Sequence, residues 1–431
     1  MAQFRKDTHQ YLGDSKTLFE TVMIADQYGN LVGAANPSGM AVDGFGRARS
    51  SFPVTLFDSQ HRYFDNGRIN TANTAGGTFT HNANTSMIEM TIDSTTGAEV
   101  KRETSRAFPY QPGKSLQVMI TFTMNSPKSG LRQRAGYFSE QNGIYLEQDG
   151  SNVYIVKRSY TSGSVVNTRV LQSNWNMDTM LGNGPSGLTL DLTKSQIFFM
   201  DIEWLGVGSV RAGFVVNGQF IHCHTFHHAN IATETYMTTA TLPGRVEITN
   251  TGGMTGTATY KQACFTVISE GGYDLRGRAR SILTPVTAPR TLTTAGVYYP
   301  VVSIRLKSTR LDAVAVLKNL HILGTSNVAR YSYKIVSNAT VTGGTWNSFG
   351  DDSNVEYSID STTMSGGTDR IGGYTTVSNQ SAPVVTLDGE TFKYQLERNT
   401  FTSTPVTLTL AIAGGANGDT VLAGLDWEEI V

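Results

Sequence analysis

Hydrophobic and polar residues alternate along residues 115–124. The apolar side chains on one parity of this segment are Leu116, Val118, Ile120, Phe122 and Met124. Polar residues such as Gln117 and Thr121 stand on the other parity. Because successive side chains of a strand point to opposite faces of a sheet, the pattern predicts a half-buried antiparallel strand.

Two Asx-Gly pairs, Asp149-Gly150 and Asn217-Gly218, indicate tight turns further along the chain. Such pairs accept the positive φ angles of hairpin turns. Apolar segments flank both pairs, at residues 144–148, 153–157, 210–216 and 219–226. Further short apolar segments occur at residues 188–192, 197–204, 245–249 and 263–269. Since these segments are short and show no helical period, we predict an antiparallel β-sandwich of jelly-roll kind over residues 109–275.

A second β-rich region follows residues 276–292. That segment holds four arginines and two prolines and shows no period, so we predict a linker there. Beyond it lie eight apolar segments, at residues 298–306, 313–324, 329–336, 355–359, 384–387, 392–398, 406–413 and 420–430. Gly-Gly and Asp-Gly pairs separate several of them, which is typical of β-turns. We predict a second antiparallel sandwich over residues 293–431.

The first 108 residues are the least regular part of the chain. Five glycines stand between Gly29 and Gly46, and residues 70–85 are almost all small or polar. Such segments cannot bury a core of their own. We therefore predict an irregular N-terminal arm over residues 1–108 that docks on a neighbouring domain or on another subunit. The predicted fold class is all-β, with two jelly-roll-like antiparallel β-sandwich domains behind this loop-rich arm.

Charge and composition exclude several functions. The 431 residues include 34 basic and 35 acidic ones, a net charge of −1. A chain without a basic surplus lacks the attraction to phosphates that drives nucleic-acid binding. No stretch approaches the roughly 18 apolar residues of a membrane helix, and no apolar signal core follows Met1, so we expect synthesis in the cytosol and no membrane partner. Cys223 and Cys264 are too few for a disulfide framework and are expected to be buried thiols.

Four histidines cluster in residues 222–228. On a regular strand His222 and His224 would share one face about 7 Å apart, a spacing compatible with two ligands of zinc or copper. No Cys-x-x-Cys and no acidic residue stands at a spacing that would complete such a site. We therefore expect ordinary packing here and no cofactor or metal, with His222 and His224 as the candidates if a metal is bound.

Asp201 and Glu203 alternate beside Trp204, so their carboxyl groups are expected on one face of a strand. The spacing is similar to the strand motif Glu-x-Asp-x-x-Glu of concanavalin-like glycoside hydrolases. Here the first two acids stand in the opposite order, and Gly206 replaces the last glutamate. We expect no enzymatic activity and no catalytic residue, and we keep a glycoside hydrolase as the weakest alternative.

Six short passages of the chain are distinctive, at residues 110–114 (YQPGK), 143–150 (GIYLEQDG), 187–192 (GLTLDL), 204–211 (WLGVGSVR), 242–248 (LPGRVEI) and 268–273 (ISEGGY). Together they resemble passages of a family of tailed-bacteriophage virion structural proteins. The resemblance implies a non-enzymatic virion component made in the host cytoplasm. It further implies a capsid-decorating, neck, baseplate or tail-fibre protein that forms a homo-oligomer and contacts other virion proteins.

The alternative function is a lectin-like, receptor-binding module that recognises host glycans. Aromatic rings offer an apolar face and a polar edge, which suits stacking on a sugar ring. Trp175 and Tyr145 are the candidate platforms. This alternative is compatible with the structural one, because a particle component can also bind a host surface.

Overall fold

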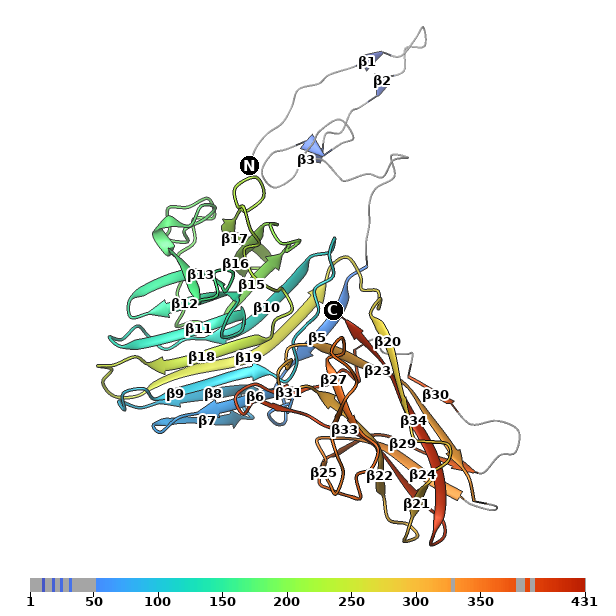
Figure 1. The fold of residues 1–431 in the computed structure, drawn as a ribbon. Helices are drawn as coiled ribbons and strands as arrows, with labels where there is room; N and C mark the ends of the chain where they lie inside the picture. The colour runs from blue at the N-terminus through green and yellow to red at the C-terminus, as the bar shows by residue number, and fades with distance from the viewer. Residues whose placement is uncertain are drawn as a thin grey trace. The chain divides into compact units, whose positions relative to one another are not determined.

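The computed structural model describes residues 52–326, 330–376, 384–387 and 392–430 (Figure 1). It also describes four short strands nearer the N-terminus, which are β1 (Gln10–Tyr11), β2 (Leu18–Phe19), β3 (Ile24–Ala25) and β4 (Leu31–Val32). Strand β1 pairs with β2, and β3 pairs with β4, both antiparallel. The chain divides into two units, Met1–Phe52 and Pro53–Val431, and the second unit contains both sandwiches.

The first sandwich consists of two antiparallel sheets. The eight-stranded sheet has the order β17-β16-β15-β10-β19-β8-β7, and β5 also pairs with β19. Its strands are β5 (Val54–Ser59), β7 (Gly77–Asn82), β8 (Met87–Ile92), β10 (Leu116–Thr123), β15 (Gln196–Ile202), β16 (Val210–Val216), β17 (Gln219–Phe226) and β19 (Ala258–Ser269). The seven-stranded sheet has the order β14-β13-β12-β11-β18-β9-β6. Its strands are β6 (Ile69–Asn73), β9 (Glu99–Thr104), β11 (Leu131–Phe138), β12 (Gly143–Asp149), β13 (Asn152–Ser159), β14 (Val166–Leu171) and β18 (Gly244–Asn250).

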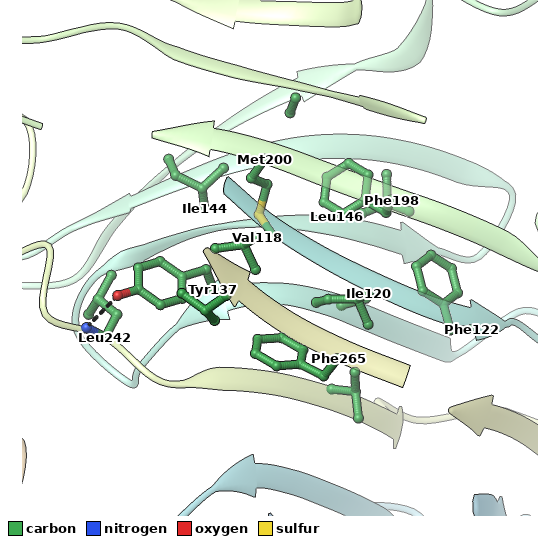
Figure 2. Close-up of a cluster of buried hydrophobic side chains, with 14 of the residues drawn as sticks. Val118, Ile120, Phe122, Tyr137, Ile144, Leu146, Phe198, Met200, Leu242 and Phe265 are labelled. Carbon is green, nitrogen blue, oxygen red and sulfur yellow. Dashed lines mark hydrogen bonds between the residues drawn. The ribbon is translucent and has the colours of Figure 1, made fainter. Parts of the chain in front are cut away.

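The apolar core of this sandwich lies between the two sheets. Fully buried side chains of both sheets meet there, among them Val118, Ile120, Phe198 and Met200 of one sheet and Tyr137, Ile144 and Leu146 of the other (Figure 2). Buried and half-buried residues alternate along β10, which confirms the predicted strand period. The hydroxyl of Tyr137 accepts a hydrogen bond from the backbone amide of Leu242 (3.1 Å) and donates toward the carbonyl of Ala240 (2.9 Å), so its burial leaves no unpaired polar group.

The second sandwich also consists of two antiparallel sheets. The five-stranded sheet contains β20 (Arg278–Leu283), β21 (Arg290–Leu292), β23 (Val314–Gly324), β30 (Val384–Thr386) and β34 (Asp419–Ile430). The six-stranded sheet has the order β26-β27-β22-β33-β24-β29, with β22 (Tyr299–Leu306), β24 (Arg330–Ser337), β26 (Asn347–Ser348), β27 (Val355–Ser358), β29 (Thr368–Thr376) and β33 (Leu408–Gly414). Two small ribbons pair β25 (Thr340–Thr342) with β28 (Thr363–Ser365), and β31 (Arg398–Asn399) with β32 (Thr404–Pro405). Trp427 of β34 is 1% exposed in the core between the sheets.

Arg398 joins the two sandwiches. Its side chain is 1% exposed, and its guanidinium donates to Glu103 Oε1 (3.1 Å) of the first sandwich and to Asp312 Oδ1 (2.9 Å) of the second. It also donates to the carbonyl of Thr104. Three apolar side chains of the second sandwich pack in the core of the first, namely Val314, Val316 and Phe392. The two sandwiches therefore share polar and apolar contacts.

The predicted arm over residues 1–108 needs correction from Val54 onward. Strands β5 to β9 lie in this range and belong to the two sheets of the first sandwich. Phe57 pairs with Val267, and Val100 pairs with Ile248, so each partner stands far along the chain. Composition could not show this pairing, because it joins segments that are distant in sequence. The rest of the predicted arm falls almost entirely outside the described residues.

The predicted linker over residues 276–292 is also corrected, because it contains β20 and β21. Both strands pair with β34, with Arg280 opposite Trp427 and Arg290 opposite Val421. Most residues of β20 are exposed. Edge strands often carry charged side chains, which prevent pairing with strands of other molecules. Three of the four arginines that suggested a linker thus belong to strands, Arg278 and Arg280 to β20 and Arg290 to β21.

The two-sandwich, all-β fold class is confirmed. The structure extends the first domain from residues 109–275 to 54–269 and begins the second with β20 at Arg278. The only helical element among the described residues is η1 (Gln172–Asn174), a single 3-10 turn. Of the two thiols, Cys223 is buried as predicted, whereas Cys264 is exposed. Within the described part of the chain, no helix is long and apolar enough to span a membrane.

Candidate functional site

Strand β17 carries both histidines that were considered as metal ligands, and a β-bulge separates them. In the pairing with β16, Ala212 lies opposite His224 and Gly213 lies opposite His222, so Cys223 is an extra residue. Ala212 and Gly213 are adjacent in β16 and therefore face opposite sides of the sheet. His224 and His222, which lie opposite them, also point to opposite sides. The predicted shared face is therefore corrected. Among the described residues, no group of three or more His, Cys, Asp or Glu side chains could hold a metal ion.

The two histidines have different surroundings. His222 packs edge-on against Phe199, with 5.1 Å between ring centroids. His224 is 7% exposed, and its Nδ1 accepts a hydrogen bond from the backbone amide of Asn176 (3.3 Å). Burial, together with the nearby His227, lowers the pKa of His224 to about 4. His224 is therefore a neutral hydrogen-bond acceptor within the fold.

Neither predicted aromatic platform is available to a sugar. Trp175 is 4% exposed, and its Nε1 donates to the carbonyl of Val170 (3.1 Å). Tyr145 is fully buried, and the guanidinium carbons of Arg134 and Arg158 lie 5.3 and 5.2 Å from its ring centroid. Both rings are structural, because a stacking platform must present one face to solvent. The prediction of glycan platforms at these two positions is thus corrected.

The predicted acid pair does lie in a pocket, which has a volume of about 600 Å³ and opens where β15 ends. Its polar lining comes from separate parts of the first sandwich and includes Tyr110, Lys114, Asp201, Glu203, Ser209, Arg211 and His227. We call it the acidic pocket. The structure thus brings Asp201 and Glu203 into one pocket, although Glu203 lies just beyond the end of β15 and not on the strand as predicted.

Asp201 is paired with a cation within the acidic pocket. It lies directly opposite Arg211 of β16, and the guanidinium is 2.6 Å from Asp201 Oδ2. The side chain of Asp201 is 14% exposed. Burial raises the pKa of Asp201, and Arg211 opposes this shift by stabilising the carboxylate. Arg211 also retains free donors, because a guanidinium has five N–H groups.

A tight loop after β15 positions Glu203. The backbone amide of Ser209 donates to Glu203 Oε2 (3.2 Å), and Ser209 Oγ lies 3.4 Å from His227 Nδ1. Gly206 adopts a φ of 81°, and a Cβ at Gly208 would stand 2.4 Å from the carbonyl oxygen of Glu203. The Gly-x-Gly sequence therefore allows the chain to fold back so that Ser209 and His227 approach the carboxylate.

Tyr110 contributes an unpaired hydroxyl. Its side chain is 9% exposed, and its hydroxyl makes no hydrogen bond of ordinary geometry among the described residues, although the backbones of Gly113, Trp204 and Leu205 lie near it. Its ring meets Trp204 edge-on at 5.9 Å, and Trp204 Nε1 is likewise buried without a partner. Buried polar groups are nearly always paired, so these two atoms indicate a place where a ligand or water would bind. Sequence analysis did not single out Tyr110 or Arg211 as site residues, because only tertiary contacts bring them to Asp201.

Comparison with known proteins finds no matching family model and no similar curated protein. Solved structures with a similar fold include the CBM2 module of the evolved Dit of Lactobacillus casei BL23 phage J-1, with 6% identity, a TM-score of 0.34, and coverage of 52% of this chain and 100% of that one. Arcelin-5, a lectin-like defence protein from Phaseolus vulgaris, has 9% identity, a TM-score of 0.31, and coverage of 51% and 99%. A structure from work on endo-acting O-glycanases of human gut microbiota has 11% identity, a TM-score of 0.35, and coverage of 50% and 99%. Each overlaps about half of this chain, and at this level of similarity none assigns it a function.

Proposed function

We propose that the protein is a non-enzymatic binding protein whose acidic pocket holds a saccharide. The observation that carries the proposal is the gathering of two carboxylates, one guanidinium, one ammonium and one imidazole in the pocket that Tyr110 also lines. Carboxylates only accept hydrogen bonds, guanidinium groups only donate them, and a sugar hydroxyl does both. A sugar ring with neighbouring hydroxyls can therefore donate hydrogen bonds to the carboxylates and accept them from the guanidinium.

The contacts of the two carboxylates favour binding without hydrolysis. A glycosidase needs one carboxylic acid that gives its proton to the leaving oxygen. Here Arg211 pairs with the ionised form of Asp201, and the amide of Ser209 donates to Glu203. Burial raises the pKa of Asp201, but its ion pair holds the group as an acceptor. We therefore propose recognition, with both acids as hydrogen-bond acceptors for ligand hydroxyls.

A glycan array probed with the full chain tests the proposal, with Tyr110→Phe as the informative variant. The Tyr110 hydroxyl makes no hydrogen bond of ordinary geometry among the described residues, so its removal should cost the fold little. We expect the variant to keep the unfolding midpoint of the wild type and to bind the glycan about fivefold more weakly, the value of one hydrogen bond. Tyr374→Phe is the matched control, because Tyr374 is 90% exposed on the second sandwich.

Three results would contradict the proposal. Absence of binding to every glycan on the array would remove the ligand class. Equal affinity of Tyr110→Phe and the wild type for the best glycan, measured by calorimetry, would show that the glycan binds outside the acidic pocket. Release of new reducing ends from a bound polysaccharide, abolished by Glu203→Gln, would show a glycosidase.

A virion structural role is the second candidate, and the sheet edges favour it. Strand β17 ends the eight-stranded sheet with Phe220 40% exposed, and Val166 of β14, which ends the seven-stranded sheet, is 51% exposed. Edge strands with exposed apolar side chains are suited to pairing with another copy of a chain. The resemblance of several passages to tailed-phage structural proteins supports the same proposal.

The copy number in purified particles tests this second candidate. Hundreds of copies per particle, measured against the major capsid protein, would indicate head decoration. A few to a few dozen would indicate a neck, baseplate or fibre protein. A chain that stays monomeric in light scattering and is absent from particles would contradict a structural role and leave glycan binding unaffected.

A further inference from the structure

A second pocket, of about 570 Å³, lies where the two sandwiches meet. Its walls include Phe57 and Asp58 of β5, Arg68 and Arg106 of the first sandwich, and Arg370 and Glu397 of the second. We call it the junction pocket. It shares no lining residue with the acidic pocket, so the two can be tested separately.

Arg106 is the central cation of the junction pocket. Its side chain is 3% exposed, and one terminal nitrogen donates to the carbonyl of Phe392 (2.7 Å). Its Nε is buried and has no hydrogen-bond partner. Among the described residues, no carboxylate lies within ion-pair distance of Arg106. A buried guanidinium without a counter-ion is costly, because its charge has lost water and gained no opposite charge.

Two further arginines approach Arg106. The guanidinium carbon of Arg68 lies 4.8 Å from the ring centroid of Phe57, and that of Arg106 lies 5.8 Å from the same ring. Arg370 is exposed on β29 at the rim of the pocket. The charges of Arg68 and Arg370 both disfavour the protonated form of Arg106, which shows that like charges converge here.

The acidic residues of the junction pocket do not neutralise the three arginines. Asp58 and Glu397 favour the protonated form of Arg106, but burial outweighs them and lowers the pKa of Arg106 to about 10. Neither acid forms an ion pair with Arg68, Arg106 or Arg370 among the described residues.

We propose that the junction pocket binds the oxyanion group of a small organic ligand, a carboxylate or a phosphate. Arginine presents several donors in one plane and is suited to both groups. The anion would supply the partner that Arg106 Nε lacks, while the half-buried Val54 offers apolar surface to the body of the ligand. The site is independent of the saccharide proposed for the acidic pocket.

Isothermal titration calorimetry on the full chain tests the inference with four probes. D-glucuronate carries a carboxylate, glucose 6-phosphate carries a phosphate, inorganic phosphate lacks an organic body, and methyl glucoside lacks the charge. We expect one of the three anions to bind and methyl glucoside to give no heat at this site. Equal affinity for inorganic phosphate and glucose 6-phosphate would support the oxyanion site and show that the organic body adds nothing.

Arg370→Gln is the informative variant, because Arg370 is exposed and its loss should not affect folding. We expect at least about tenfold weaker anion binding, the effect of losing one charged hydrogen bond. Arg106→Met, which keeps the length of the side chain, should abolish binding. Arg276→Gln, an exposed residue outside both pockets, is the matched control and should bind as the wild type does.

Two results would overturn the inference. The first is absence of heat with all three anions at millimolar concentration. The second is equal anion affinity of the wild type and Arg370→Gln. Tyr110→Phe separates this site from the proposed function, because it should weaken glycan binding in the acidic pocket and leave anion binding unchanged.

Discussion

His224 shows at the scale of one residue how burial determines chemistry. A histidine near the surface titrates close to its ordinary pKa of 6.5 and can bind a metal or a proton. At 7% exposure, with Nδ1 accepting the amide of Asn176, the ring of His224 must stay neutral to keep this contact. His224 is therefore a part of the folded structure that responds to acid, and it shares no metal site with the other histidines of residues 222–228.

We predict a stability loss in acid that depends on His224. Its pKa is about 4 in the folded protein and near 6.5 when unfolded, so the unfolded state binds more protons between these pH values. The free energy of unfolding should therefore fall as the pH decreases from about 6.5 to about 4. The contribution of this residue is on the order of 3 kcal/mol at pH 4.

Urea unfolding at pH 7, 5.5 and 4 measures this effect. His224→Gln, which keeps a hydrogen-bond acceptor, should lose less stability across this range than the wild type. His61 has its pKa lowered to about 4 by burial as well, so a part of the acid sensitivity should remain in the variant. Identical pH profiles of the two proteins would refute the assignment to His224.

Turns and bulges show what can be predicted at the scale of elements. The Asn217-Gly218 pair was expected to join two strands, and it does: β16 ends at Val216 and β17 begins at Gln219. The bulge at Cys223 was not predicted, because no residue type requires it and the pairing with β16 alone creates it. Residues 188–192, which were expected to form a strand, make only an isolated bridge between Leu181 and Thr189.

We predict that Gly218→Ala weakens the hairpin through backbone strain alone. Gly218 has a φ of 76°, and a Cβ there would meet nothing within 4 Å. An L-residue in this conformation costs about 1 kcal/mol, so the free energy of unfolding should fall by that amount. Asn217→Gly at the neighbouring position, with a φ of 52°, is the control and should change stability little. An unchanged urea midpoint for Gly218→Ala would contradict the prediction.

The contacts between the two sandwiches affect the stability of the whole second unit. Glu103 is 2% exposed between the guanidinium groups of Arg245 and Arg398, at 3.2 and 3.1 Å. Burial raises the pKa of Glu103, and both arginines oppose the shift. Removing one partner of such a buried set leaves an uncompensated charge, which is far more costly than loss of an exposed ion pair.

We predict that Arg398→Ala destabilises the unit by about 3–5 kcal/mol and separates the unfolding of the sandwiches. Tryptophans in both sandwiches allow each to be followed, with Trp175 in the first and Trp427 in the second. The fluorescence of proteins that keep only one of these tryptophans reports the unfolding of one sandwich at a time. Without Arg398→Ala both should show the same unfolding midpoint, and with Arg398→Ala the two midpoints should differ. Arg276→Ala, at an exposed position, is the control. Coincident transitions with unchanged midpoints would show that the junction contributes little.

The sequence by itself determined the all-β class, the two sandwiches and several turns. These features depend on residues one or two positions apart, and strand alternation and turn chemistry are local. Only the tertiary structure decided that residues 54–104 belong to the sheets, that Tyr145 is buried, and that Tyr110 and Arg211 line the same pocket. The physical reason is that strand pairing joins distant segments, and burial depends on what the rest of the chain places over a residue.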